Sequence, residues 1–277
     1  MVGSDRPENR WVVLGASNVA NLLPSLLRHT GRSTTERQTY LCACGHGRSY
    51  GLKSRFFWRR LPPILSSELW GWWRQLPPAE SERGLITDIG NDLIYGVRPQ
   101  LAARWAIEAA QRLGERCQRV VVAGLPLESL QSARRWQLDL LRRIVFPNTP
   151  LSLDDAVSRA TELDERLREW IDGQSGDRWV YVAPDPAWYG LDPIHVRFRF
   201  AHDAWSRWLG PLQLPSPSDV AGRSSMSTAE RSPSRARLPA WWRVRWASAA
   251  QRELLGRNRV TQQPALRWDA DHWLALF

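Results

Sequence analysis

Residues 10–18, RWVVLGASN, constrain the fold of this chain more than any other stretch. Residues 11–14 form a short apolar run that is rich in β-branched side chains, and such a run predicts a buried strand. Gly15, Ala16 and Ser17 follow at once, and small residues of this kind are typical of a sharp turn. The segment therefore predicts a strand that ends in a turn carrying a hydroxyl group.

A helix is expected directly after this turn. Its apolar residues recur with the period of an amphipathic helix, at Val19, Leu22, Leu23, Leu26 and Leu27. Pro24 is compatible with a helix that begins near Asn21, because the amides of a first turn need no intrahelical partner. A serine between a strand and a helix N-terminus lies where amides and the helix dipole favour negative charge. Many such turns carry a serine without a chemical role, so the evidence for a nucleophile must come from further along the chain.

The composition is that of a soluble chain with an excess of arginine. The 277 residues, 43% hydrophobic and 24% charged, suffice for one domain of about 200 residues and an appendage. The formal net charge is +10 and Lys53 is the only lysine, which favours acidic partners or surfaces such as phosphate, carboxylate or anionic lipid.

The cysteine count and the hydropathy favour a cytoplasmic location. Cys42, Cys44 and Cys117 form neither an even disulfide set nor a Cys-x-x-Cys metal pair, which indicates a reducing compartment. The polar N-terminus leaves no room for a signal peptide. No apolar run approaches the roughly 18 residues that span a bilayer, although peripheral attachment to a membrane stays open.

Strand and helix patterns alternate along most of the chain. Further strands are expected at residues 39–44, 84–89, 119–123 and 179–183, and helices at residues 64–75, 98–114, 130–144, 152–171 and 200–209. This alternation predicts an α/β fold with a parallel sheet that is wound on both faces. Trp70, Trp72 and Trp73 in the first of these helices are too many for one face, so they either fill the gap over the core or line a groove.

The chain changes in character from residue 211 onward. Residues 211–239 form a Ser/Pro/Arg-rich linker after a domain at residues 1–210, and residues 240–277 are rich in Trp and Arg. This last segment is either a basic amphipathic piece that contacts an anionic membrane or a terminal segment that packs on the body. A nucleic-acid arm is the weakest alternative, because basic and aromatic content alone specifies no groove or base.

Four short motifs follow predicted strands, where ligands collect in parallel sheets. They are Gly15-Ala16-Ser17, the glycine loop at residues 45–51, Gly90-Asn91-Asp92 and Asp192-Pro193-Ile194-His195. If Ser17 attacks an acyl carbonyl, His195 would take the hydroxyl proton and Asp192 would hold the other ring nitrogen. The oxyanion would need donors, which the amides of Ser17 and of a loop glycine and the side chain of Asn91 offer.

This order of motifs resembles the SGNH hydrolase superfamily, the GDSL-type esterases and lipases, over residues 11–209. The resemblance implies a three-layer α/β/α, flavodoxin-like fold with a C-terminal extension. It also implies a catalytic triad of Ser17, Asp192 and His195, with an oxyanion hole formed by Ser17, Gly47 and Asn91. Gly47 is preferred to Gly45 because Gly47-Arg48-Ser49 is similar to the second motif of some carbohydrate acetylesterases.

Two positions depart from the family pattern. Ala16 stands where the family has the aspartate that usually steadies the first motif, and Ile89 displaces a glycine in the third motif. Neither change removes a catalytic atom. Asp88 is an additional acid, and we interpret it as a structural carboxylate without a catalytic role.

We therefore expect a serine ester hydrolase, an acyl or acetyl esterase that works through an acyl-enzyme with no metal and no cofactor. The expected substrate is a small-molecule, lipid or carbohydrate ester, and no nucleic acid is expected as a partner. Two alternatives remain open. One is an acyltransferase that uses the same site, and the other is an inactive SGNH-fold protein that binds an acidic partner or a membrane.

Overall fold

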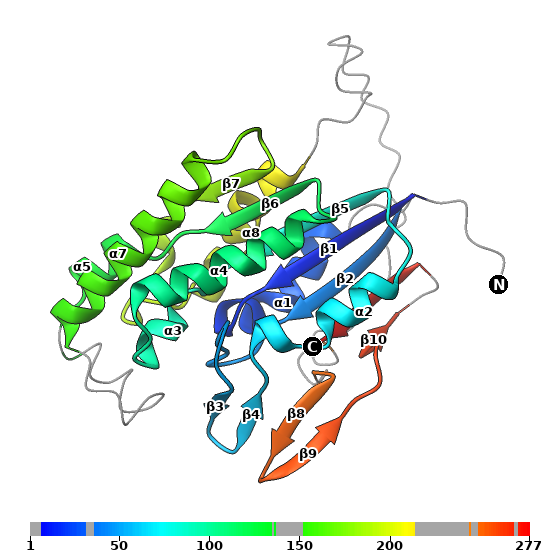
Figure 1. Cartoon of the computed structure of the whole chain (residues 1–277), viewed down its shortest axis with the longest axis horizontal. Coiled ribbons are helices and arrows are strands. Elements are labelled where there is room, and N and C mark those ends of the chain that lie inside the picture. Colours follow the sequence, from blue (N-terminus) through cyan, green and yellow to red (C-terminus); the bar gives the residue numbers. More distant parts are fainter. Residues whose placement is uncertain are drawn as a thin grey trace.

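The computed structural model describes residues 7–31, 36–134, 136, 152–213, 244, 249–268 and 271–277. Within these ranges, a seven-stranded sheet of order β10-β11-β2-β1-β5-β6-β7 forms the centre of the molecule (Figure 1). Its strands are β1 (Glu8–Leu14), β2 (Arg37–Ala43), β5 (Ser81–Ile86), β6 (Arg119–Ala123), β7 (Trp179–Val182), β10 (Leu266–Arg267) and β11 (His272–Leu276). All neighbours pair in parallel except β10 with β11. The predicted α/β fold with a parallel sheet is confirmed.

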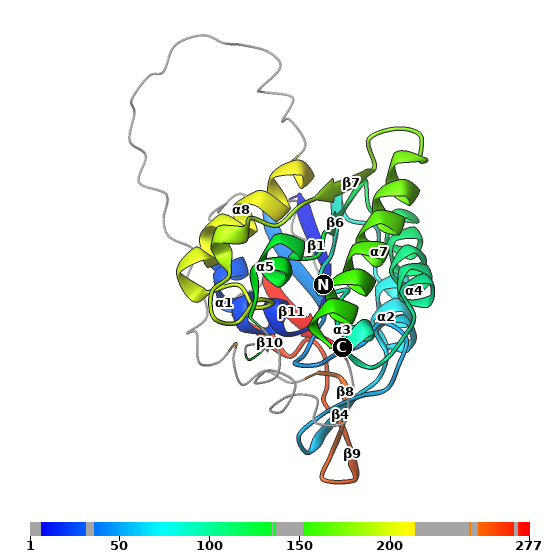
Figure 2. The same ribbon diagram turned by 90° about the vertical axis from the view of Figure 1, so that its left-hand side faces the viewer.

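Helices cover both faces of this sheet, as Figure 2 shows. The helices α1 (Ser17–Thr30) and α8 (Ala201–Leu209) pack on one face, and α2 (Leu69–Gln75), α4 (Pro99–Gly114) and α7 (Leu153–Asp172) pack on the other. Val12 of β1 points to the second layer of helices, whereas Val13 points to the first. A strand buried on both faces needs a continuous apolar run, which explains the sequence of β1.

The order β2-β1-β5-β6-β7 is the flavodoxin-like strand order. The carboxyl ends of these strands therefore meet at one edge of the sheet, and the predicted three-layer α/β/α arrangement is confirmed. Shorter elements complete the body: α3 (Asn91–Ile94), α5 (Leu127–Ser132) and 3-10 turns at Ile64–Ser66, Pro186–Trp188, Phe198–Phe200 and Gly210–Leu212.

The first helix differs from the sequence-based expectation. It begins at Ser17 and not near Asn21, so Pro24 lies inside it. The early start has a physical reason, because the carboxylate of Asp88 accepts hydrogen bonds from backbone amides at the beginning of the helix. These bonds satisfy groups that a helix N-terminus otherwise leaves without partners.

The helix expected at residues 64–75 is shorter than predicted. Residues 64–75 form the 3-10 turn Ile64–Ser66 and then α2, with the backbone at Ser67 extended between them. Trp70 and Trp73 of α2 are buried in the core, and the Trp72 ring contacts those of Trp273 and Phe277. Trp70 and Trp73 therefore fill the core, and Trp72 packs against it.

The helix expected at residues 130–144 is represented by α5, Leu127–Ser132. Most of the remainder of that expected range lies outside the described residues.

Strand β5 ends at Ile86 and not at Ile89, because Asp88 takes a left-handed conformation with φ of 59°. Asp88 thereby turns the chain away from the sheet at the edge where the motifs gather.

The described part of the C-terminal segment packs on the body. Strand β11 pairs in parallel with β2, and Leu274 and Ala275 are fully buried. The strands β8 (Gln251–Leu254) and β9 (Arg257–Val260) join β3 (Ser54–Phe56) and β4 (Arg59–Leu61) in a second, antiparallel sheet. Residues 214–239 of the expected linker lie outside the described residues. A bilayer-crossing helix, which needs both length and apolar composition, is not found in the described ranges.

We expect Leu274→Ala to destabilise the whole fold. Its side chain is 0% exposed, and truncating a buried leucine costs about 2–5 kcal/mol of unfolding free energy. Urea unfolding of the full chain measures this loss. The control is Val260→Ala in β9, whose side chain is 79% exposed. Equal stability of the two variants would contradict the placement of β11 in the core.

Candidate active site

The structure brings together three residues that are far apart in the sequence. The Oγ atom of Ser17 lies 2.7 Å from Nε2 of His195, and Nδ1 of His195 lies 2.6 Å from Oδ2 of Asp192. Ser17 is the first residue of α1, directly beyond the turn that ends β1. This serine, histidine and aspartate form the hydrogen-bonded series used by serine hydrolases to activate a hydroxyl group.

Asp192 also shapes the loop that carries the histidine. Its Oδ1 atom accepts hydrogen bonds from the amides of Ile194 at 3.0 Å and His195 at 3.1 Å. The other carboxylate oxygen holds the imidazole ring. The same side chain therefore closes the loop and orients the ring, which explains the spacing of three residues between the acid and the histidine.

The electrostatic surroundings favour the charged form of His195. Burial lowers the pKa of its imidazole, but the hydrogen bond and charge of Asp192, together with the charge of Asp88, outweigh burial and raise the pKa above 6.5. For Asp192, burial raises the pKa, but the hydrogen bond and charge of His195, together with the amides of Ile194 and His195, outweigh burial and lower the pKa below its ordinary value. A stabilised imidazolium is what a general base needs after it accepts a proton.

Asp88, predicted to be a structural carboxylate without a catalytic role, organises the turn before Ser17. Its Oδ2 atom accepts hydrogen bonds from the amides of Ala16 at 2.6 Å and Asn18 at 3.1 Å, and its Oδ1 atom accepts one from the Asn18 side chain at 2.6 Å. A carboxylate at a helix N-terminus is also favoured by the helix dipole. Asp88 thus supplies a carboxylate to the first motif, where Ala16 carries none.

Asn18 joins the serine helix to the histidine loop. Its side-chain amide donates a hydrogen bond to the carbonyl of Ile194 at 3.0 Å, and its side-chain oxygen accepts one from the amide of Val196 at 2.9 Å. These two residues flank His195. Sequence reasoning missed Asn18, because the only signal was its position next to Ser17.

The turn between β1 and Ser17 has room only for a glycine at position 15. A Cβ atom at this position would lie 2.5 Å from Cγ2 of Val19 and 2.8 Å from Cγ2 of Thr87. Both contacts are shorter than packed atoms allow. The close approach of the two strand ends therefore depends on glycine.

The glycine loop and Asn91 lie against each other. Gly47 has φ of +66°, and its carbonyl accepts a hydrogen bond from the Tyr95 hydroxyl at 2.5 Å. The Asn91 side-chain amide donates to the carbonyl of Arg48 at 3.2 Å, and its backbone amide donates to Asp88 at 3.3 Å. Among the described residues, no hydrogen bond joins Gly47 or Asn91 directly to Ser17, so their role in an oxyanion hole stays a prediction.

Two buried charged side chains, Asp92 of α3 and Arg48 of the glycine loop itself, hold the loop in place. Asp92 accepts hydrogen bonds from the Ser49 hydroxyl and, at 3.1 Å, from the amide of Tyr50. Burial raises the pKa of Asp92 to about 6, against the effect of these bonds. The Arg48 guanidinium is also buried, and it donates to the backbone carbonyls of Cys44 and Phe277. The loop therefore depends on contacts from both α3 and the C-terminal strand.

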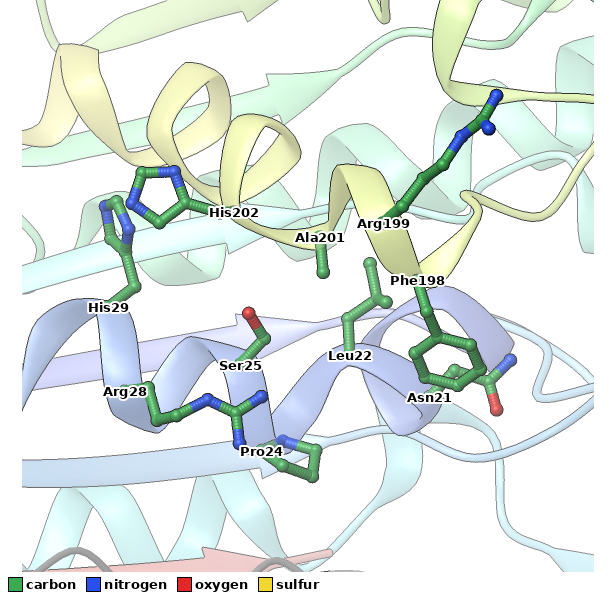
Figure 3. Close-up of a pocket in the computed structure, with 10 residues that line it drawn as sticks. All are labelled: Asn21, Leu22, Pro24, Ser25, Arg28, His29, Phe198, Arg199, Ala201 and His202. Carbon is green, nitrogen blue, oxygen red and sulfur yellow. The ribbon is translucent and has the colours of Figure 1, made fainter.

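A pocket of about 460 Å³ lies between α1 and the segment leading into α8 (Figure 3). It is lined by Asn21, Leu22, Pro24, Ser25, Arg28, His29, Phe198, Arg199, Ala201 and His202. Helix residues four apart share a face, so Asn21 continues the face of α1 that carries Ser17.

The described residues contain no group of three or more His, Cys, Asp or Glu side chains placed to hold a metal ion.

Comparison with known proteins finds similarity only among solved structures. No protein-family model and no curated protein matches the chain. A member of the lipolytic protein G-D-S-L family from Veillonella parvula is 9% identical, with a TM-score of 0.44, over 71% of this chain and 95% of that one. A putative platelet activating factor from Streptococcus pneumonia is 15% identical, with a TM-score of 0.47, over 76% and 86% of the two chains. The structure of TesA is 14% identical, with a TM-score of 0.38, over 74% and 100%.

We expect Asp88→Ala to destabilise the fold, because the amides of Ala16 and Asn18 lose their acceptor. Leaving buried amides without a partner costs about 1–3 kcal/mol. Chemical denaturation measures the change, and Asp172→Ala, at an exposed position near the end of α7, is the matched control. A variant as stable as the control would show that Asp88 does not hold the turn.

Proposed function

We propose that this chain is a serine ester hydrolase of the SGNH type that works through an acyl-enzyme. The observation that carries the proposal is the series of hydrogen bonds from Ser17 through His195 to Asp192. Ser17 also lies at the N-terminus of α1 and at the carboxyl edge of the sheet. This position supports the same conclusion, because ligands collect at this edge in such folds.

In the proposed first step, Oγ of Ser17 attacks the acyl carbonyl carbon of the ester. Nε2 of His195 accepts the hydroxyl proton, and Asp192 stabilises the imidazolium that results. The proposed donors to the oxyanion are the amides of Ser17 and Gly47 and the side chain of Asn91. When the tetrahedral intermediate collapses, the ester C–O bond breaks and the alcohol leaves with the proton from His195.

In the second step, water attacks the acyl-enzyme. His195 takes a proton from this water and returns it to Oγ of Ser17, so the carboxylic acid leaves and the free serine is restored. An acyltransferase would use the same residues with a second alcohol in place of water. Acyl lipids and acetylated carbohydrates both remain candidate substrates.

The two departures from the family pattern are compatible with activity. Asp88 bonds the turn in which Ala16 replaces an aspartate, and the third motif still presents Asn91 against the glycine loop. These contacts favour the enzyme over an inactive protein that only binds. The free thiols of Cys42, Cys44 and Cys117 support a reducing, cytoplasmic location as part of the proposal.

Hydrolysis of p-nitrophenyl acetate and of longer acyl esters tests the proposed function. We expect Ser17→Ala and His195→Ala each to lower kcat/KM by at least about 1000-fold, because triad residues act as a unit. Ser158→Ala, at an exposed position of α7, should leave kcat/KM unchanged. Full activity of Ser17→Ala would overturn the proposal, and release of product only with an added alcohol would indicate acyl transfer.

The pH dependence of kcat/KM should follow the titration of His195. Because its pKa lies above 6.5 and only the neutral ring accepts a proton, we expect kcat/KM to rise with pH through that pKa and then level off. In Asp192→Asn, the main cause of the raised pKa is removed, so the inflection should move to lower pH. Rates measured from about pH 5 to about pH 9 cover both inflections. A wild-type rate that is independent of pH over this range would contradict the role of His195.

A further inference from the structure

The second sheet extends from the body of the molecule and ends in two adjacent turns. Figures 1 and 2 both show the β3–β4 and β8–β9 turns at the same end. The contact is direct, because the amide of Leu255 donates a hydrogen bond to the carbonyl of Trp58 at 3.0 Å. We call residues 57–58 and 255–256 the hairpin tip.

The hairpin tip exposes large apolar side chains. Phe57, Trp58 and Leu255 are 56%, 62% and 75% exposed. Phe57 and Leu255 both have φ of 51°, a left-handed conformation in which glycine and asparagine are ordinarily favoured. Bulky apolar residues at two such positions are unfavourable for the turns themselves. They therefore indicate a use for the apolar surface outside the fold.

Basic side chains surround the hairpin tip. Residues 52–61 and 251–260 contain seven basic residues and one acid, Glu253. The basic residues are Lys53, Arg55, Arg59, Arg60, Arg252, Arg257 and Arg259. Glu253 pairs with Lys53 and Arg60, so most of the positive charge is not neutralised by an acid within these two segments.

Some of this charge is repulsive within the sheet. Arg252 lies directly opposite Arg259 across β8 and β9, and like charges in such pairs destabilise a sheet. An anionic partner at the hairpin tip would reduce this repulsion.

We propose that the hairpin tip docks on an anionic phospholipid bilayer. Phe57, Trp58 and Leu255 enter the interfacial layer, where aromatic side chains are favoured, and the surrounding arginines contact lipid phosphates. A second copy of this chain fits the surface less well, because it would present the same positive charge. The tip also projects from the body, and a projecting tip inserts into a lipid layer more readily than it packs against a flat protein surface.

The hairpin tip connects directly to the glycine loop. The rings of His46 and Phe56 stack with centroids 5.3 Å apart, those of Phe56 and Phe57 lie 4.7 Å apart, and those of Phe57 and Trp58 lie 5.7 Å apart. This row of rings runs from the loop that contains Gly47 to the tip. If the proposed hydrolase function is correct, docking brings lipid esters to the side of the molecule that carries this loop.

Co-sedimentation of the full chain with vesicles tests the proposal. We expect binding to phosphatidylcholine vesicles that contain phosphatidylglycerol, weak binding to phosphatidylcholine alone, and weaker binding at high salt. The variant Phe57→Ser/Trp58→Ser/Leu255→Ser keeps the net charge and should lower partitioning by at least about tenfold. Trp136→Ser, which alters a tryptophan that is 50% exposed elsewhere on the chain, is the matched control and should bind as wild type.

The charge contribution is tested separately. Each removed arginine should weaken binding about fivefold, so Arg257→Gln/Arg259→Gln is expected to bind about 25 times more weakly. The control pair, Arg104→Gln/Arg207→Gln, removes the same charge from exposed positions on α4 and α8. Thermal unfolding of each variant establishes that it is folded.

Three results would overturn the docking proposal. They are wild-type binding by the triple tip variant, equal losses in the two arginine pairs, and a self-association that the tip variant abolishes. Ser17→Ala should bind vesicles as wild type does. Docking and hydrolysis are therefore tested independently, and the failure of one is distinguishable from the failure of the other.

Discussion

The carboxylate of Asp88 is the group on which the geometry of the candidate site depends. It bonds the turn before α1 and the side chain of Asn18, and Asn18 bonds the backbone on both sides of His195. Ser17 and His195 are 178 positions apart. A hydrogen bond between two such distant side chains needs both backbones to be held, and Asp88 and Asn18 hold them.

The glycine loop depends on contacts from a different part of the chain. Asp92 holds it from α3, and Arg48 of the loop donates to the backbone of Phe277. Strand β11, which ends one residue before Phe277, extends the sheet beside β2. The C-terminal strand therefore supports the same edge of the sheet that carries Ser17. The stability of the site therefore depends on residues that lie outside the four motifs.

The parts that the sequence predicts well depend on local patterns. The run of valines in β6 marks a strand covered on both faces, and the turn before Ser17 and the loop of His195 follow strand ends. Asp88 was predicted as a structural carboxylate, but its partners were not, because they depend on a left-handed backbone and lie about 70 positions earlier. The strands β8 and β9 were missed because arginine and glutamate interrupt the apolar alternation that predicts a strand. Strand β8 forms because it pairs with β4, and this pairing between distant segments leaves no local pattern in the sequence.

Covalent labelling tests whether His195 makes Ser17 a nucleophile, on which the proposed function depends. The full chain is treated with a fluorophosphonate, and peptide mass spectrometry locates the adduct. We expect a single adduct on the peptide that contains Ser17, and no adduct in His195→Ala under the same conditions. Labelling of another serine, or undiminished labelling of Ser17 in His195→Ala, would contradict it.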